Sequence, residues 1–153
     1  MKFIAAVAAL ALAAVAQAQT FTSCATGATD MTVSSITLDK NPLCVGENVC
    51  ATVTGTLANP IVETTPGSTK LAIVGRYLGR VVYTDNHDLC TLLAASGHPC
   101  PVATSVTSVT ACVLVKTSAP VGVPVALTIQ ATNGNGNTIF CQTATVTAAN
   151  CPV

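Results

Sequence analysis

The sequence predicts an all-β protein, an immunoglobulin-like β-sandwich of about seven strands with one short helical turn, stapled by disulfide bonds. Beyond residue 18, short runs rich in Val, Thr, Ala and Ile are separated by turns that contain Gly and Pro. Several of these runs alternate apolar with polar residues, as strands with one buried face do. All eight cysteines lie in the same part of the chain. These three observations together favour a small, cross-linked sandwich.

Residues 1–18 have the features of a secretory signal peptide. Lys2 supplies the positive charge, residues 3–16 form an unbroken apolar run, and Ala16-Gln17-Ala18 fits a cleavage site. The alternative is a membrane anchor, but the run is shorter than the roughly 20 residues that a membrane span needs. We therefore expect a secreted, extracellular protein whose domain comprises residues 19–153.

The strands follow from alternation and from turn residues. Residues 49–57 alternate most clearly, with threonines on one face and small or apolar side chains on the other. Residues 70–83 form the longest apolar run and fit either two strands or one strand bent at Gly75 or Gly79. The other expected strands are residues 31–38, 102–116, 123–131 and 138–148, with a glycine-rich hairpin turn before the last.

One stretch, residues 88–102, predicts a helical turn among these strands. Asp88 can cap its start, because a carboxylate accepts hydrogen bonds from the first backbone N–H groups of a helix. Leu89, Leu92 and Leu93 have helical spacing, and Gly97 suits a left-handed exit. Cys90 and Cys100 lie on either side of this turn.

Composition excludes several classes of function. Apart from Lys2 the chain has five basic and six acidic residues, so no basic field exists to attract nucleic acid. Only two histidines accompany the cysteines and no Cys-x-x-Cys occurs, so we expect no metal site. His87 and His98 are expected in ordinary surface or loop positions. Because no Gly-x-Ser-x-Gly and no glycine-rich phosphate loop occur, we expect neither an enzyme nor a cofactor.

The order of several short motifs resembles the ML lipid-recognition domain family. Fungal phosphatidylglycerol/phosphatidylinositol transfer proteins are the closer likeness, and the family includes the Niemann–Pick type C cholesterol-binding protein. The resemblance extends over residues 31–148 and is most specific around Cys90 and Cys100. The motifs are Val33-Ser34-Ser35-Ile36-Thr37-Leu38, Val53-Thr54-Gly55-Thr56, Arg76-Tyr77, Asp88-Leu89-Cys90, Cys100-Pro101-Val102, Pro120-Val121-Gly122-Val123 and Gly136-Asn137-Thr138-Ile139-Phe140-Cys141.

The resemblance implies three disulfide bonds. They are Cys44–Cys50, Cys90–Cys100 and Cys24–Cys141. Cys112 and Cys151 go beyond the family's three-bridge pattern and are expected to pair with each other as Cys112–Cys151. The main alternative exchanges Cys141 and Cys151 as partners of Cys24.

The family binds a lipid between its two sheets, and this composition is suited to such a cavity. Beyond residue 18 the chain has four aromatic residues and no Trp, so small apolar side chains fill most inward positions. Rigid sheets lined in this way can enclose a dry cavity, whereas the alternative is that the sheets simply approach more closely. The candidate lining residues are Val53, Leu57, Ile61, Ile73, Tyr77, Val125, Leu127, Ile129 and Phe140.

Lys70, Arg76 and Arg80 are candidates for contact with a lipid headgroup or an anionic membrane. Their even spacing would place them on one face of an unbroken strand, where the alternative is an ordinary solvated surface.

The function that follows is a secreted monomer that binds one sterol or phospholipid and touches membranes transiently. The alternative is a structural or adhesive sandwich without a lipid, for which the hydroxyl-rich residues 104–110 would form an exposed strand.

Overall fold

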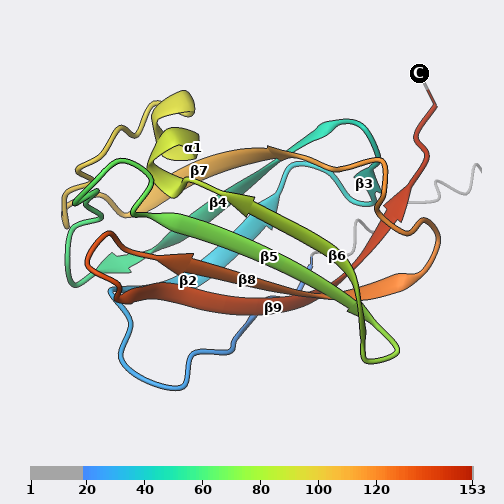
Figure 1. Ribbon diagram of the computed structural model, residues 1–153, viewed down its shortest axis with the longest axis horizontal. Coiled ribbons are helices and arrows are strands. Elements are labelled where there is room, and N and C mark those ends of the chain that lie inside the picture. Colours follow the sequence, from blue (N-terminus) through green and yellow to red (C-terminus); the bar gives the residue numbers. More distant parts are fainter. Residues whose placement is uncertain (1–18, 153) are drawn as a thin grey trace, which may run out of the picture.

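The computed structural model describes residues 19–152 as a sandwich of two β-sheets (Figure 1). One sheet has the strand order β1-β9-β8-β5-β6, with β3 added in parallel along β9, and the other has the order β2-β4-β7. The elements are β1 (Thr22–Ser23), β2 (Met31–Leu38), β3 (Leu43–Cys44), β4 (Asn48–Leu57), β5 (Lys70–Tyr77), β6 (Arg80–His87), α1 (Leu89–Ala95), β7 (Ser108–Leu114), β8 (Pro124–Thr132) and β9 (Thr138–Ala149).

The predicted all-β sandwich with one short helix is confirmed. Seven of the strands have seven or more residues, while β1 and β3 have two each. The predicted signal peptide, residues 1–18, lies outside the described residues and stays a prediction. Within residues 19–152, no helix is long and apolar enough to cross a membrane.

The long apolar run divides into two strands, β5 and β6, at a two-residue turn. Tyr77 pairs with Arg80, and both residues between them have positive φ angles, 50° for Leu78 and 78° for Gly79. Two successive left-handed residues match the twist of the flanking strands, which is why such turns connect hairpins. The turn places Arg76 and Arg80 on neighbouring strands, so the unbroken strand that would carry Lys70, Arg76 and Arg80 on one face does not exist.

The expected strand over residues 102–116 is shorter in the structure. Residues 104–107 form an exposed turn and loop, and β7 begins only at Ser108. Val109 is 6% exposed and belongs to the core. The idea of an exposed hydroxyl-rich strand over residues 104–110 is therefore wrong.

Helix α1 forms as predicted. The Asp88 carboxylate accepts hydrogen bonds from the backbone N–H groups of Cys90 and Thr91. Leu89 and Leu93 face the core, being 4% and 1% exposed. Gly97 has a φ angle of 86°, a left-handed conformation that costs glycine little. The helix connects β6 in one sheet to β7 in the other.

Two predicted disulfide bonds are present and two are wrong. Cys24–Cys141 and Cys90–Cys100 form as predicted. Cys44–Cys50 and Cys112–Cys151 do not form; the structure has Cys44–Cys151 and Cys50–Cys112 instead.

Strand pairing explains both exchanges. Cys50 of β4 lies directly opposite Cys112 of β7, with a Cα–Cα distance of 4.0 Å, on the outer face of the three-stranded sheet. Cys44 lies opposite Ala149 in the parallel β3–β9 pair, which brings it within reach of Cys151 just beyond β9.

Candidate binding cavity

An apolar cavity lies between the two sheets. Its volume, counted as the space open to the centre of a water molecule, is about 130 Å³. One water needs about 10–15 Å³ in this measure, and native cores contain few voids larger than that. The sheets are therefore held apart by more than ordinary packing requires.

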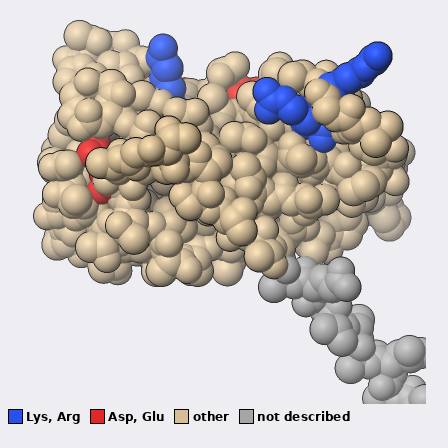
Figure 2. Space-filling view, turned by 90° about the horizontal axis from the view of Figure 1, so that it is seen from below, with Lys and Arg blue, Asp and Glu red and all other residues tan. Residues whose placement is uncertain are grey.

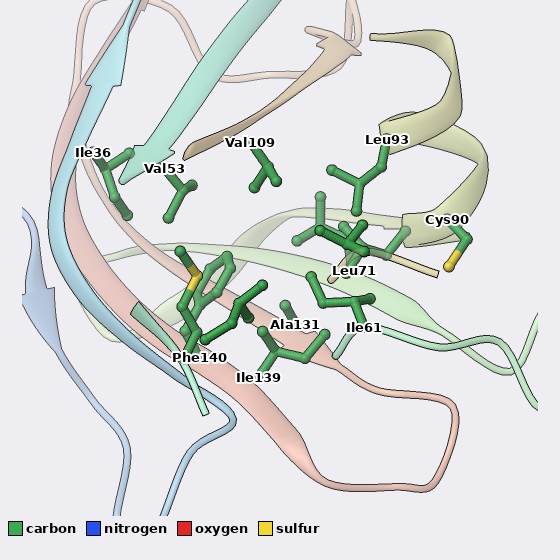
Figure 3. Close-up of a cluster of buried hydrophobic side chains, with 14 of the residues drawn as sticks. Ile36, Val53, Ile61, Leu71, Cys90, Leu93, Val109, Ala131, Ile139 and Phe140 are labelled. Carbon is green, nitrogen blue, oxygen red and sulfur yellow. The ribbon is translucent and has the colours of Figure 1, made fainter. Parts of the chain in front are cut away.

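Side chains of both sheets and of α1 line this cavity. Figure 3 shows part of the arrangement, with Val53 and Val109 of one sheet facing Phe140 of the other, and Leu93 of α1 at one side. The lining residues are Phe21, Ile36, Leu38, Leu43, Val49, Ala51, Val53, Leu71, Ile73, Tyr83, Leu89, Leu93, Val109, Ala111, Val113, Val115, Ala119, Pro120, Val125, Leu127, Ile129, Phe140, Val146 and Ala148.

Small residues at facing positions help to leave this space open. Ala51 of β4 and Ala111 of β7 are register partners and both line the cavity. On the opposite sheet, Gly75 follows Leu71 and Ile73 in the inward-facing row of β5. A Cβ atom at Gly75 would lie 2.8 Å from Val125 Cγ1 and 3.1 Å from Tyr83 Cβ, so a side chain there would displace its neighbours.

A polar cluster closes the edge of the sandwich where β6 and β7 lie. Lys116, two residues after β7, places Nζ 2.8 Å from Asp85 Oδ1 on β6 and donates a hydrogen bond to the Thr84 carbonyl oxygen at 2.9 Å. The other oxygen of Asp85 is 2.6 Å from His87 Nε2. The Lys116 backbone N–H donates to the Tyr83 hydroxyl at 3.5 Å. Since β6 and β7 are edge strands of different sheets, these polar contacts connect the two edges.

The charges in this cluster depend on one another. Burial alone would raise the pKa of Asp85, but hydrogen bonds from Lys116 and His87 hold it below the ordinary value. The hydrogen bond to Asp85 raises the pKa of Lys116. Burial of the Tyr83 ring raises the pKa of its hydroxyl, which therefore stays protonated at neutral pH. The edge thus has a carboxylate and an ammonium beside a neutral phenol.

Comparison with known proteins identifies the family. A family model described as ML domain matches residues 18–148. The chain belongs to the ML-domain family. ML domains are lipid-binding proteins, and the predicted resemblance is confirmed. No curated protein sequence matches the chain.

Two solved structures are similar to this ML domain in fold. A Niemann–Pick type C2 protein from Japanese carpenter ant has a TM-score of 0.63 and 14% identity, over 84% of this chain and 98% of the other. Chicken MD-1, solved as a complex with lipid IVa, has a TM-score of 0.50 and 12% identity, over 83% of this chain and 86% of the other.

Six of the nine residues predicted to line a cavity in this ML domain lie in its wall. They are Val53, Ile73, Val125, Leu127, Ile129 and Phe140. Their contact with a lipid stays a prediction.

The other three predicted residues do not line the cavity. Leu57, 4% exposed at the end of β4, packs in the core beyond it. Ile61, 1% exposed, is buried in the core and forms a β-bridge with Val102. Tyr77 is half-buried beside the hairpin turn.

Sequence reasoning missed the wall that β7 and α1 provide. Val109, Ala111 and Val113 alternate with outward residues, and this alternation was present in the sequence. Leu89 and Leu93 were predicted to form the apolar face of a helix, but nothing local says that this face meets a cavity. Tyr83 gave no signal, because its role depends on where β6 lies in the sheet.

The predicted headgroup residues do not gather in one place. Lys70 begins β5, and Arg76 lies six residues along the same strand, or roughly 20 Å away. Arg76 and Arg80 flank the β5–β6 turn, where Leu78 is 84% exposed and Val81 54% exposed. On the face shown in Figure 2, basic side chains gather toward this end of the molecule on a largely uncharged surface.

Proposed function

We propose that this ML domain is a secreted carrier that holds one lipid between its two sheets and moves it between membranes without chemistry. The observation that supports this most is the apolar cavity, whose wall comes from both sheets. Family membership supports the same function, and so does the lipid complex of chicken MD-1, which has a similar fold.

The driving force would be burial of the lipid's hydrocarbon part. Each buried CH₂ group contributes about 0.8 kcal/mol, so a 16-carbon tail would gain on the order of 10 kcal/mol relative to water. That gain offsets much of the cost of taking a lipid out of a bilayer. Four disulfide bonds tie the chain together, so the protein does not need a ligand in order to fold and the space between the sheets exists before a lipid binds. The predicted signal peptide and these disulfides support secretion.

The β5–β6 hairpin is suited to the transient membrane contact that transfer requires. Leu78 and Val81 expose apolar side chains next to Arg76 and Arg80. Within residues 19–152, no carboxylate lies within ion-pair distance of either arginine. Both guanidinium groups are therefore available for anionic headgroups, while Leu78 can enter the interfacial region of the bilayer.

Vesicle binding tests this contact. Each basic residue near an anionic surface contributes about 1 kcal/mol, so Arg76→Gln and Arg80→Gln should each weaken binding to phosphatidylserine vesicles about fivefold. Lys40→Gln, which removes a lysine paired with Glu47, is the matched control and should bind normally. Equal binding by all four proteins would contradict the assignment.

Lipid uptake tests the carrier function itself. Purified protein is mixed with vesicles that contain a self-quenched fluorescent phospholipid or sterol, and dequenching is followed with and without acceptor vesicles. The carrier should take up one lipid per chain and should speed transfer in proportion to its concentration. Protein that neither takes up nor transfers any lipid would leave the alternative, a structural sandwich, as the better description.

A further inference from the structure

Within residues 19–152, the cavity wall has one polar side chain. Among the described residues that line it, only Tyr83 has a polar side-chain atom, and its hydroxyl lies beside Lys116 at the β6–β7 edge. We propose that Tyr83 and Lys116 form the headgroup anchor of the cavity, and that they select a single-chain lipid with an anionic head, a carboxylate or a phosphate. This inference rests on the proposed carrier function and adds the class of lipid.

The hydrogen-bonding groups at this edge are available as donors. An ammonium has three N–H donors, and Lys116 uses two of them on Asp85 and on the Thr84 carbonyl. The Tyr83 hydroxyl accepts from the Lys116 backbone, and none of the described residues accepts its proton. The acceptors, by contrast, are occupied, because both Asp85 oxygens already receive hydrogen bonds. The third N–H of Lys116 and the O–H of Tyr83 are therefore unused donors, while the Asp85 acceptors beside them are occupied. Such a site recognises an oxyanion, which only accepts hydrogen bonds, better than a hydroxyl group, which also needs an acceptor.

Asp85 keeps the lysine in position. Its carboxylate is 6% exposed and fixes Nζ on the β6 side of the gap, whereas the Lys116 side chain is 45% exposed. The Lys116 ammonium also lies 5.9 Å from the centroid of the Tyr83 ring, so the two side chains are neighbours. A lipid head bound there would stay at the surface while its tail enters the cavity. Since Lys116 and Asp85 together carry no net charge, the preference for an anionic head over a neutral one would come from the hydrogen bonds that Lys116 and Tyr83 donate.

The shape of the cavity favours a single chain. Lining residues on β9 extend from Phe140 to Ala148, a span of roughly 26 Å for eight residues of strand. If a volume of about 130 Å³ extends along that wall, the space is narrow. An unbranched acyl chain fits such a space, whereas a fused ring system would require the sheets to move apart. Gly75 lies opposite Tyr83 in the β5–β6 register, so the neighbouring position on β5 adds no side chain of its own beside the anchor.

Matched lipids test the anchor directly. Displacement of a fluorescent fatty acid from the full-length secreted protein is measured with a long-chain fatty acid, the alcohol of the same length and the corresponding lysophosphatidate. The anionic lipids should bind at least about tenfold more tightly than the alcohol, the usual effect of hydrogen bonds to a charged group. Whichever of the acid and the lysophosphatidate binds more tightly identifies the preferred oxyanion.

Variants then assign the preference to residues. Tyr83→Phe and Lys116→Gln should each lower the ratio of acid to alcohol affinity toward one. Lys40→Gln, which also removes an ion-paired lysine, should keep the full ratio. If Lys116→Gln does not fold, Tyr83→Phe alone decides, since it removes a single oxygen atom.

The results that would overturn the anchor are distinguishable from failure of the carrier function. Equal affinity for acid and alcohol in the wild-type protein, or a ratio that neither variant changes, would refute the anchor while leaving lipid binding intact. Failure of all three lipids to bind to protein that takes up the fluorescent phospholipid or sterol would refute the anchor alone, whereas protein that takes up no lipid at all would refute the carrier function and the anchor with it.

Discussion

Filling the cavity from the side of β7 should separate its role in binding from its role in stability. Ala111 lines the cavity opposite Ala51, so Ala111→Leu adds three carbon groups to the space between the sheets. At about 0.8 kcal/mol per group, the added carbons would stabilise the empty protein by up to roughly 2.4 kcal/mol. The same carbons would exclude about three methylene groups of a lipid, which corresponds to a loss of affinity of roughly 50-fold.

Two measurements on the same variant test this reasoning. Urea unfolding of lipid-free protein gives the change in the free energy of unfolding, and displacement of a fluorescent lipid gives the change in affinity. Ala126→Leu is the matched control, because Ala126 is exposed on the outer face of β8 and should change neither quantity much. Overpacking a core typically costs about 1–3 kcal/mol. If Ala111→Leu lowers the free energy of unfolding by about 1 kcal/mol or more and the variant still binds lipid normally, the core is overpacked at Ala111 and the space there is not used by a ligand. That result would refute the proposed role of the cavity.

Three further predictions concern the Cys90–Cys100 bridge, the polar cluster at the β6–β7 edge and the contact between β2 and β4. The Cys90–Cys100 bridge joins residues with a sequence separation of 10, so the Cys90→Ser/Cys100→Ser variant should lose roughly 3 kcal/mol in its free energy of unfolding. Because the bridge fixes α1 against the cavity, the variant should release lipid faster than wild type even under conditions where it is folded. Retention as tight as in the wild type would contradict this. The pKa of Asp85 is lower in the folded protein than the roughly 3.9 of an unfolded chain, so its contribution to stability is complete above that pH and is lost as the pH falls through the folded value. Asp85→Asn should therefore lose less stability than wild type between pH 5 and pH 2 in urea unfolding, and equal slopes would show that the carboxylate does not take part. Gly55→Ala should lower the free energy of unfolding by about 1–3 kcal/mol, because the new Cβ would lie 2.2 Å from the Thr32 carbonyl oxygen; an unchanged midpoint in urea would contradict that close approach.

Local features of the fold were predictable from the residues themselves, whereas the one long-range contact predicted correctly, Cys24–Cys141, came from the family resemblance. The cap at Asp88 and the end of α1 at Gly97 depend on neighbouring residues only, and both are present as predicted. The pairing of Cys50 depends on which strand lies beside β4, and no residue near it specifies β7. The resemblance to the ML family gave Cys24–Cys141 and Cys90–Cys100 but not Cys50–Cys112 or Cys44–Cys151.

The candidate site shows the same division. Alternation along single strands predicted six lining residues, since inward direction is a local property of a strand. The contact between Tyr83 and Lys116 joins positions 33 residues apart and forms only because the edges of two sheets meet there. Such a contact requires the packing of the sheets, which the alternation of one strand does not specify.

The space between the sheets is proposed to hold one lipid. Native mass spectrometry of protein purified from culture medium, followed by extraction and identification of whatever has co-purified, tests it most directly. We expect one lipid per chain on the wild-type protein, with an anionic head and a single tail among the species recovered, and much less on Ala111→Leu. Protein that is free of lipid and takes up none when it is offered would contradict the claim.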